Sequence, residues 1–177
     1  MEDFKFYTQP SSSPKLIILV GIPLCGRSYW CKSNSKGFEV ISRDNVRVYL
    51  YGSSQIVSEH CEEKVTEHFK FRLKKAYLCN LNVILDNSNC SEAYIDKIIA
   101  TCPIEYEIEV RFFDISLFWA MVRNYIRWMR QKKYTPLHIM IMLKESYNRI
   151  NREKYTKFGV KCNNCYEKHT NDKKRTS

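Results

Sequence analysis

The sequence predicts an α/β fold in which a mostly parallel β-sheet is sandwiched by helices. Apolar runs of strand length alternate with longer segments of helical periodicity, which is typical of βαβ units. Two of these runs are continuously apolar, as expected for parallel strands that are buried on both faces. The chain of 177 residues is long enough for one domain with a substantial core.

Four strands are expected, and the fourth run alternates between polar and apolar residues. Alternation of this kind indicates an edge or half-exposed strand. The expected strands are residues 15–20, 38–42, 81–86 and 105–113.

Four helices are expected between and after these strands. The first has an apolar stripe at i, i+4 spacing, Ser91 is a plausible cap for the second, and Pro136 suits the first turn of the last. The helices span residues 56–79, 91–101, 116–131 and 137–151, and the stripe consists of Val57, Cys61, Val65, Phe69, Leu73 and Tyr77.

The folded domain is placed at residues 14–158, between a flexible segment 1–13 and a basic, flexible tail 159–177. No signal peptide or membrane-length apolar run is seen, so a soluble, cytoplasmic protein is expected, in the host-cell cytoplasm if it is viral. The eight cysteines fit reduced thiols. Cys162, Cys165 and His169 offer three ligands where structural zinc needs four, so metal binding and ordinary loop cysteines both stay open.

The net charge of +10 is concentrated in the C-terminal third of the chain. Residues 111–177 hold 16 Lys and Arg against 5 Asp and Glu, whereas residues 1–110 hold 13 against 14. Such a field favours a polyanionic partner such as nucleic acid. A solvated basic surface is the alternative.

The segment Gly21-Ile-Pro-Leu-Cys-Gly26-Arg27-Ser28 follows the first strand directly. It matches the phosphate-binding pattern G-x-x-x-x-G-K-[ST], except that Arg27 replaces the lysine. Ser28 is the expected Mg²⁺ ligand, and a plain Gly/Pro turn is the alternative. The phosphates of ATP are assigned to Gly21, Cys25, Gly26, Arg27, Ser28 and Tyr29.

Polar segments also follow the other strands, at 42–47, at 86–89 and at Asp114, and in a parallel sheet all of these converge on one edge. Asp44 is interpreted as a general base with Arg43 and Arg47 beside it, or else as a helix N-cap. Asp86 is interpreted as a carboxylate that holds Mg²⁺ through water, or else as part of a turn. The acceptor site is assigned to Arg43, Arg47, Asp86, Ser88 and Asn89.

Three arginines, Arg123, Arg127 and Arg130, share one face of the third helix at i, i+4, i+7 spacing. The remaining face, with Leu117, Met121 and Trp128 among others, is apolar and is expected to be buried. Arginines on such a helix suit a lid that neutralises transferring phosphate oxygens. A basic outer face that contacts water or a nucleic-acid backbone is the alternative.

Taken together, the motifs resemble the kinase domain of phage-type polynucleotide 5′-kinases over roughly residues 15–150. The motifs that carry the resemblance are Gly21-x-Pro-x-x-Gly-Arg-Ser, Ser42-Arg-Asp-Asn-Val-Arg47, Asp86-x-Ser-Asn89, Phe113-Asp114, Val122-Arg-Asn124 with Arg127, and Thr135-Pro136.

The resemblance implies a P-loop kinase that uses ATP and Mg²⁺ to phosphorylate the 5′-hydroxyl end of DNA or RNA. It implies that Asp44 is the general base, that Arg47 contacts the acceptor's 3′-phosphate and that Arg123 and Arg127 form the lid. Asp86 and Asn89 would support the acceptor site. Arg27 departs from the lysine of that family, and the two cations are not interchangeable.

Two other interpretations stay open. The same fold could phosphorylate a small-molecule or tRNA-linked acceptor. Alternatively, the protein could bind nucleic acid without catalysis because the loop has lost its lysine.

Overall fold

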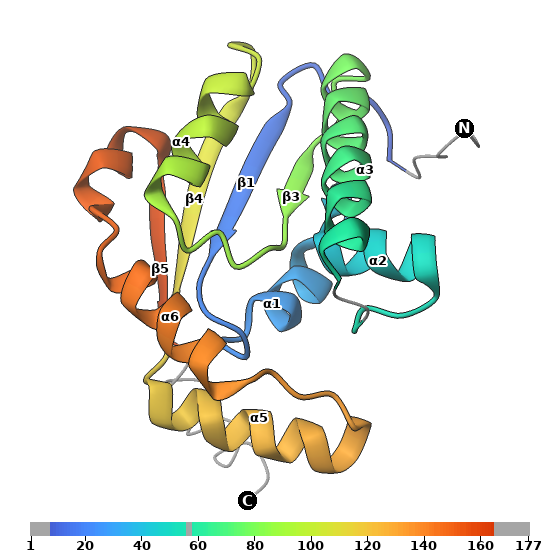
Figure 1. The fold of residues 1–177 in the computed structure, drawn as a ribbon. Coiled ribbons are helices and arrows are strands. Elements are labelled where there is room, and N and C mark those ends of the chain that lie inside the picture. Colours follow the sequence, from blue (N-terminus) through green and yellow to red (C-terminus); the bar gives the residue numbers. More distant parts are fainter. Residues whose placement is uncertain (1–7, 56–57, 165–177) are drawn as a thin grey trace, which may run out of the picture.

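The computed structural model describes residues 8–55 and 58–164 of the chain. Five parallel strands form one sheet in the order β2-β3-β1-β4-β5 (Figure 1). The strands are β1 (Lys15–Val20), β2 (Glu39–Ile41), β3 (Val83–Leu85), β4 (Glu107–Asp114) and β5 (Val160–Asn164). The predicted α/β fold with a parallel sheet is therefore confirmed.

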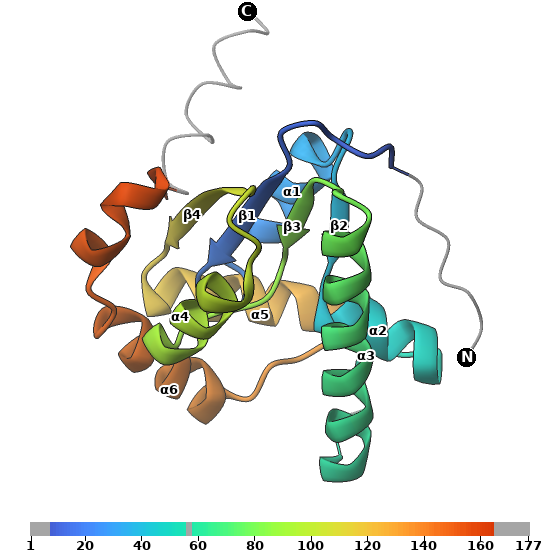
Figure 2. The ribbon, with the colours of Figure 1, turned by 90° about the horizontal axis from the view of Figure 1, so that it is seen from above.

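Six α-helices and one 3₁₀ helix connect the strands in the described part of the chain. Figure 2 shows α3, α4 and α6 on one face of the sheet and α1 on the other, and in Figure 1 α5 crosses below the carboxyl ends of the strands. The helices are α1 (Arg27–Asn34), α2 (Arg43–Tyr51), α3 (Glu59–Leu78), α4 (Glu92–Thr101), α5 (Leu117–Gln131), α6 (Leu137–Asn148) and η1 (Arg152–Phe158).

Serine side chains begin three of these helices. Ser42, Ser58 and Ser116 each accept a hydrogen bond from the backbone N–H three residues later, at the start of α2, α3 and α5. Each cap satisfies one of the four N–H groups that a helix start leaves without an intrahelical partner.

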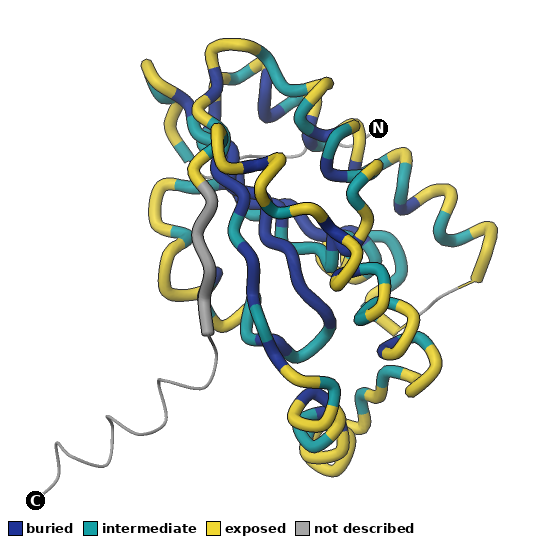
Figure 3. The backbone as a smooth tube through the Cα atoms, turned by 90° about the vertical axis from the view of Figure 1, so that its left-hand side faces the viewer, coloured by how far each residue is buried: buried dark blue, intermediate teal, exposed yellow. Residues whose placement is uncertain are grey.

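The core lies on both sides of the central strands, which Figure 3 shows as the buried centre of the molecule. Every residue of β1 after Lys15 is buried, as its continuous apolar run predicts. On β4, Phe112 packs against Tyr147 and Phe113 against Trp30, so successive rings meet helices on opposite faces. Burying each such ring contributes about 1.5–3 kcal/mol.

Of the two alternatives for the fourth strand, the edge position is wrong, because β4 lies between β1 and β5, whereas part of the strand is exposed as the other alternative predicts. The charged side chains of β4 are accommodated because they form ion pairs and hydrogen bonds. Glu109 accepts hydrogen bonds from Arg111 and lies 3.1 Å from the Lys15 ammonium, and the Arg111 guanidinium stacks over Trp30. Alternation in β4 therefore reflects ion pairs on one face of an interior strand.

The expected tail 159–177 also needs correction, because the sheet continues through β5 at Val160–Asn164. The short helix η1 and strand β5 follow α6. Their sequence has no apolar run as clear as those that predict the other strands. The rest of the tail, including Cys165 and His169, lies outside the described residues, as do residues 1–7 of the expected N-terminal segment. Ser11, in that segment, donates from its backbone to the Asn80 carbonyl.

Most of the apolar face of α5 points outward, which contradicts the expectation that it is buried, although Leu117 at the start of the helix packs against the core. Met121 and Trp128 are 40% and 42% exposed, and Phe118 and Tyr125 are more exposed still. The inward face carries Ala120 and Asn124, both buried. The helix therefore turns its polar side toward the carboxyl edge of the sheet.

None of the helices at residues 8–55 and 58–164 has the length and hydropathy that a membrane crossing requires. None of the six cysteines whose side chains are described there forms a disulfide.

Candidate active site

The phosphate loop connects β1 to α1 in a tight path that two glycines allow. A Cβ on Gly21 would lie 2.7 Å from Cys25 Sγ and 3.0 Å from the Phe113 carbonyl oxygen, so no larger residue fits without movement. Gly26 has a φ of 98° immediately before α1 begins, in the region that glycine tolerates. The Gly21 N–H donates to the Ser88 carbonyl at 2.9 Å, which ties this loop to the segment after β3.

The loop ends at a helix start, as the sequence predicts. Ser28 and Tyr29 are exposed in the first turn of α1, whose N–H groups have no intrahelical acceptors. Such a turn favours an anion. The Cys25 side chain is buried, so of this residue only the backbone faces the position predicted for phosphates.

Arg27 is held near Asp86, the residue that follows β3. Arg27 Nη1 lies 3.7 Å from Asp86 Oδ1, and both side chains are nearly buried. Among the described residues, Arg27 Nε, Arg27 Nη1 and Asp86 Oδ1 are buried polar atoms without hydrogen bonds. Buried polar atoms are usually satisfied, so these donors and this carboxylate oxygen are groups whose hydrogen bonds a bound ligand would supply.

The residues present fit a nucleotide phosphate and Mg²⁺. The donors of Arg27 suit phosphate oxygens, while the Ser28 hydroxyl and the Asp86 carboxylate are oxygen ligands of the kind that Mg²⁺ prefers. Within residues 8–55 and 58–164 there is no group of three or more His, Cys, Asp and Glu side chains arranged to hold a metal. The fit therefore rests on Ser28 and Asp86, with phosphate oxygens supplying the rest.

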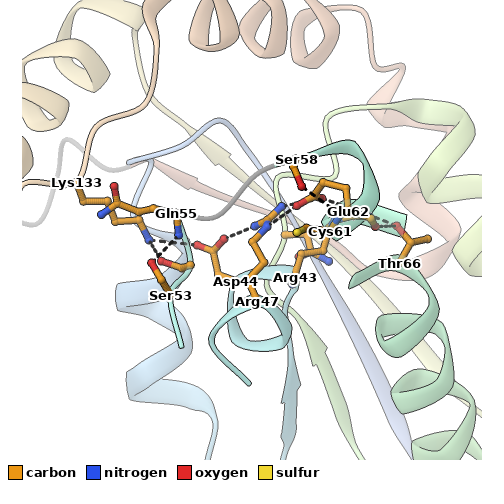
Figure 4. Close-up of polar contacts among 12 residues, drawn as sticks. Arg43, Asp44, Arg47, Ser53, Gln55, Ser58, Cys61, Glu62, Thr66 and Lys133 are labelled. Carbon is orange, nitrogen blue, oxygen red and sulfur yellow. Dashed lines mark hydrogen bonds and ion pairs between the residues drawn. The ribbon is translucent and has the colours of Figure 1, made fainter. Parts of the chain in front are cut away.

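Asp44 lies in the first turn of α2, and the alternative of a helix cap is wrong because Ser42 caps this helix. The Asp44 side chain is 57% exposed and both of its oxygens contact cations. Arg47 Nη1 lies 2.6 Å from Oδ1, and Lys133 Nζ lies 3.5 Å from Oδ2 (Figure 4). Lys133 comes from the segment between α5 and α6.

Glu62 on α3 joins this cluster, and no sequence motif singled it out. Its carboxylate accepts two hydrogen bonds from Arg47, Nε to Oε1 at 2.6 Å and Nη2 to Oε2 at 3.0 Å, and one from Arg43 Nη2 at 2.7 Å. The hydrogen bond from Arg47 is the main reason that the pKa of Glu62 is lowered. Glu62 thus holds both arginines of the predicted acceptor site.

The segment after β3 serves mainly to connect elements. The Asn87 side chain accepts from the Arg43 backbone N–H at 2.8 Å, and the Ser88 carbonyl binds the phosphate loop. Asn89, predicted to contact the acceptor, is buried, with a φ of 47°, and donates to the Leu19 carbonyl at 2.8 Å. Its contacts place it behind the site, where it positions this segment against β1.

The arginines of α5 differ in their surroundings. Arg123 Nη1 donates to the Leu24 carbonyl of the phosphate loop at 3.0 Å. Arg127 Nη2 donates to Asn124 and Thr135, and burial lowers the Arg127 pKa while the negative charge of Asp44 opposes that shift. Arg130 is exposed.

Asp114, at the end of β4, is turned away from the other polar segments. Its carboxylate accepts from Tyr147 at 2.8 Å and from Arg152 at 2.7 Å. Burial alone would raise its pKa, but these hydrogen bonds more than offset that and the pKa is lowered. The structure thus places Asp114 in the packing of α6 and η1 against the sheet.

Comparisons with known proteins bear on the family and the fold of the chain. No protein-family model matches the chain. A protein of Autographa californica nuclear polyhedrosis virus, named a bifunctional polynucleotide kinase/RNA ligase, is 34% identical in an alignment of 131 positions that covers 66% of this chain and 18% of that protein. The predicted resemblance to polynucleotide kinases is thereby confirmed, and the chain spans less than a fifth of this relative.

Solved structures show the same fold. A chain of the Pnkp1/Rnl/Hen1 RNA repair complex matches with a TM-score of 0.72 at 22% identity, over 85% of this chain and 49% of that one. The Chaetomium thermophilum protein Kti12, solved in complex with ADP-AlF3, matches with a TM-score of 0.60 at 16% identity, over 90% of this chain and 94% of that one. The fold is that of P-loop kinases.

Proposed function

We propose that this chain, which has a P-loop kinase fold, transfers the γ-phosphate of ATP to the 5′-hydroxyl end of DNA or RNA. The observation that carries the proposal is that α5 and the segment just after it contact both the phosphate loop and Asp44. Arg123 contacts the phosphate loop at Leu24, and Lys133, just after α5, contacts Asp44. A donor loop and a carboxylate base under a shared lid are what direct phosphoryl transfer requires.

Each residue then has a role. The α1 N-terminus and Arg27 bind the phosphates of ATP, and Arg123 and Arg127 neutralise charge on the transferring group. Asp44 accepts the proton of the attacking hydroxyl, and Arg47 binds the phosphate of the acceptor's first nucleotide. Ser28 and Asp86 would hold Mg²⁺, which draws charge from the phosphate oxygens when it is bound.

A nucleic-acid acceptor is supported by charge and by similarity. Residues 115–144, which include α5 and most of α6, contain no Asp or Glu and carry six Lys and Arg. A surface of this charge attracts a polyanion. The curated viral relative is named as a polynucleotide kinase and RNA ligase, which supports the same class of acceptor.

End-labelling tests the proposal. The wild-type protein should transfer radioactive phosphate from γ-labelled ATP to DNA or RNA oligonucleotides with a 5′-hydroxyl, in the presence of Mg²⁺. Asp44→Asn removes the proton acceptor and should reduce kcat by at least about a hundredfold. Glu63→Gln, which alters an exposed carboxylate on α3, is the matched control and should leave kcat unchanged.

Absence of labelling by wild-type protein with every oligonucleotide and divalent metal would refute the proposal. Transfer that bulk RNA cannot inhibit would instead favour a small-molecule acceptor. Salt-sensitive binding of oligonucleotides without any transfer would favour a protein that only binds nucleic acid.

A further inference from the structure

Both carboxylate oxygens of Asp44, the proposed proton acceptor, contact cations in the arrangement that the structure shows. Arg47 occupies Oδ1 and Lys133 occupies Oδ2. Figure 4 shows Asp44 between these two side chains, with Glu62 beyond Arg47. Each carboxylate oxygen keeps a further lone pair, and the Asp44 carboxylate becomes a better proton acceptor when one of these cations moves to another anion.

The two cations are held with unequal firmness. Arg47 is only 14% exposed, and Glu62 holds its guanidinium by two hydrogen bonds of 2.6 and 3.0 Å. The Lys133–Asp44 contact is longer, at 3.5 Å, and joins side chains that are 30% and 57% exposed. Exposed pairs of this kind contribute little, so the contact is readily exchanged for another anion.

The cluster also has a surplus of positive charge. Arg43, Arg47 and Lys133 face the carboxylates of Asp44 and Glu62, which leaves one cation in excess. Arg127 lies close enough for the charge of Asp44 to oppose the lowering of its pKa, which adds to that excess. A phosphate presents several oxygens, so it can replace a carboxylate that bridges two cations.

We propose that Lys133 is an acceptor-binding residue: with Arg47 it binds the phosphate of the acceptor's first nucleotide, and this exchange frees Asp44 for the accepting hydroxyl. The inference rests on the proposed function. It makes the phosphate both a binding group and the trigger that uncovers the base. Ser54, whose hydroxyl accepts from Lys133 at 2.8 Å, keeps the ammonium at the site.

The neighbouring lysine provides a matched control. Lys132 has a φ of 55° at the end of α5, and this turn sends adjacent side chains in different directions. Its ammonium lies 5.6 Å from the centre of the Trp128 ring on the exposed side of the helix, whereas Lys133 reaches Asp44. Lys132→Gln and Lys133→Gln therefore remove equal charges at different places.

The experiment compares two acceptors that both have a 5′-hydroxyl, adenosine 3′-monophosphate and adenosine. Lys133→Gln should raise KM for adenosine 3′-monophosphate about tenfold or more, because a charge-assisted hydrogen bond to the phosphate is lost. It should not reduce kcat/KM for adenosine, which has no phosphate to bind. Lys132→Gln should leave KM unchanged for both acceptors. Lys133→Arg keeps the positive charge, so its KM for adenosine 3′-monophosphate should return most of the way to the wild-type value.

Calorimetric binding of adenosine 3′-monophosphate to the ADP-bound protein gives a readout that does not need catalysis. Lys133→Gln should weaken this binding by the same factor. The inference would be overturned if Lys133→Gln had equal effects on KM for both acceptors or left the affinity for adenosine 3′-monophosphate unchanged. It would also be overturned if wild-type protein did not bind adenosine 3′-monophosphate. If the wild-type protein binds the nucleotide but transfers nothing, the proposed function fails, and the effect of Lys133→Gln on affinity still decides the role of Lys133.

Discussion

Arg27 occupies the lysine position of the phosphate loop, and its surroundings show how the larger cation fits. The side chain is 11% exposed and its Nη1 faces Asp86 across 3.7 Å. Both Nε and Nη1 are buried without hydrogen bonds, so the guanidinium brings more donors than the protein alone satisfies. Phosphate oxygens are the natural partners of such a fork.

Substitution of Arg27 tests whether this cation acts on the nucleotide. Arg27→Met should lower kcat at least about a hundredfold, because the charge on the transferring phosphate is no longer neutralised. Arg27→Lys keeps the charge and removes unpaired donors, so it should retain kcat within about tenfold and should not lower the melting temperature. Unchanged kcat in Arg27→Met would show that the cation is not used.

Among the elements, α5 is decisive because its orientation sets which residues face the site. Asn124 fixes that orientation. Its amide donates to the Thr135 carbonyl at 2.7 Å, and its oxygen accepts from the Thr135 N–H and from Arg127, both at 3.0 Å. These contacts join α5 to the segment just before α6 and hold Arg127 inward.

Asn124→Leu should therefore lower the free energy of unfolding by about 2–4 kcal/mol, since it leaves buried backbone groups of Thr135 without partners. Tyr125→Ser, one position along on the exposed face, should change it by less than about 0.5 kcal/mol. Urea denaturation of the two variants checks this difference. A large loss in Tyr125→Ser would mean that the outer face of α5 is covered in solution.

At the scale of the whole molecule, paired carboxylates link stability to pH. Hydrogen bonds from Arg47 lower the pKa of Glu62 below its ordinary value of 4.5. Burial would raise the pKa of Glu109, but hydrogen bonds from Arg111 and Lys15 more than offset this and lower it. Hydrogen bonds from Arg152 and Tyr147 lower the pKa of Asp114 from its ordinary value of 3.8 in the same way.

A lowered pKa means that the folded state binds fewer protons than the unfolded state, so these groups stabilise the fold fully above about pH 4.5. Their contribution should fall as the pH drops below that value and through the folded pKa values. Melting temperatures measured from pH 7 to pH 3 should therefore be level at first and then decline. Glu62→Gln should make the decline shallower, whereas Glu63→Gln should follow the wild-type curve.

Much of the fold could be predicted because it depends on local patterns. Buried apolar runs mark β1 and β3, and Val65, Phe69, Leu73 and Tyr77 are buried on α3 as their spacing predicts. The parallel order then brings the strand ends to one edge, which places Asp44 and Asp86 near the phosphate loop. Strand β5 and the outward apolar face of α5 were missed because packing against the rest of the chain, not local composition, decides them.

The sequence by itself determined the chemical groups at the carboxyl edge: a glycine loop with a cation, an aspartate after β2 and arginines on a later helix. Only the tertiary structure decided which of these groups meet. Glu62 holds Arg43 and Arg47 across 19 and 15 positions of sequence, and Lys133 reaches Asp44 across 89. Contacts at such separations depend on how whole elements pack, so no local periodicity or motif predicts them.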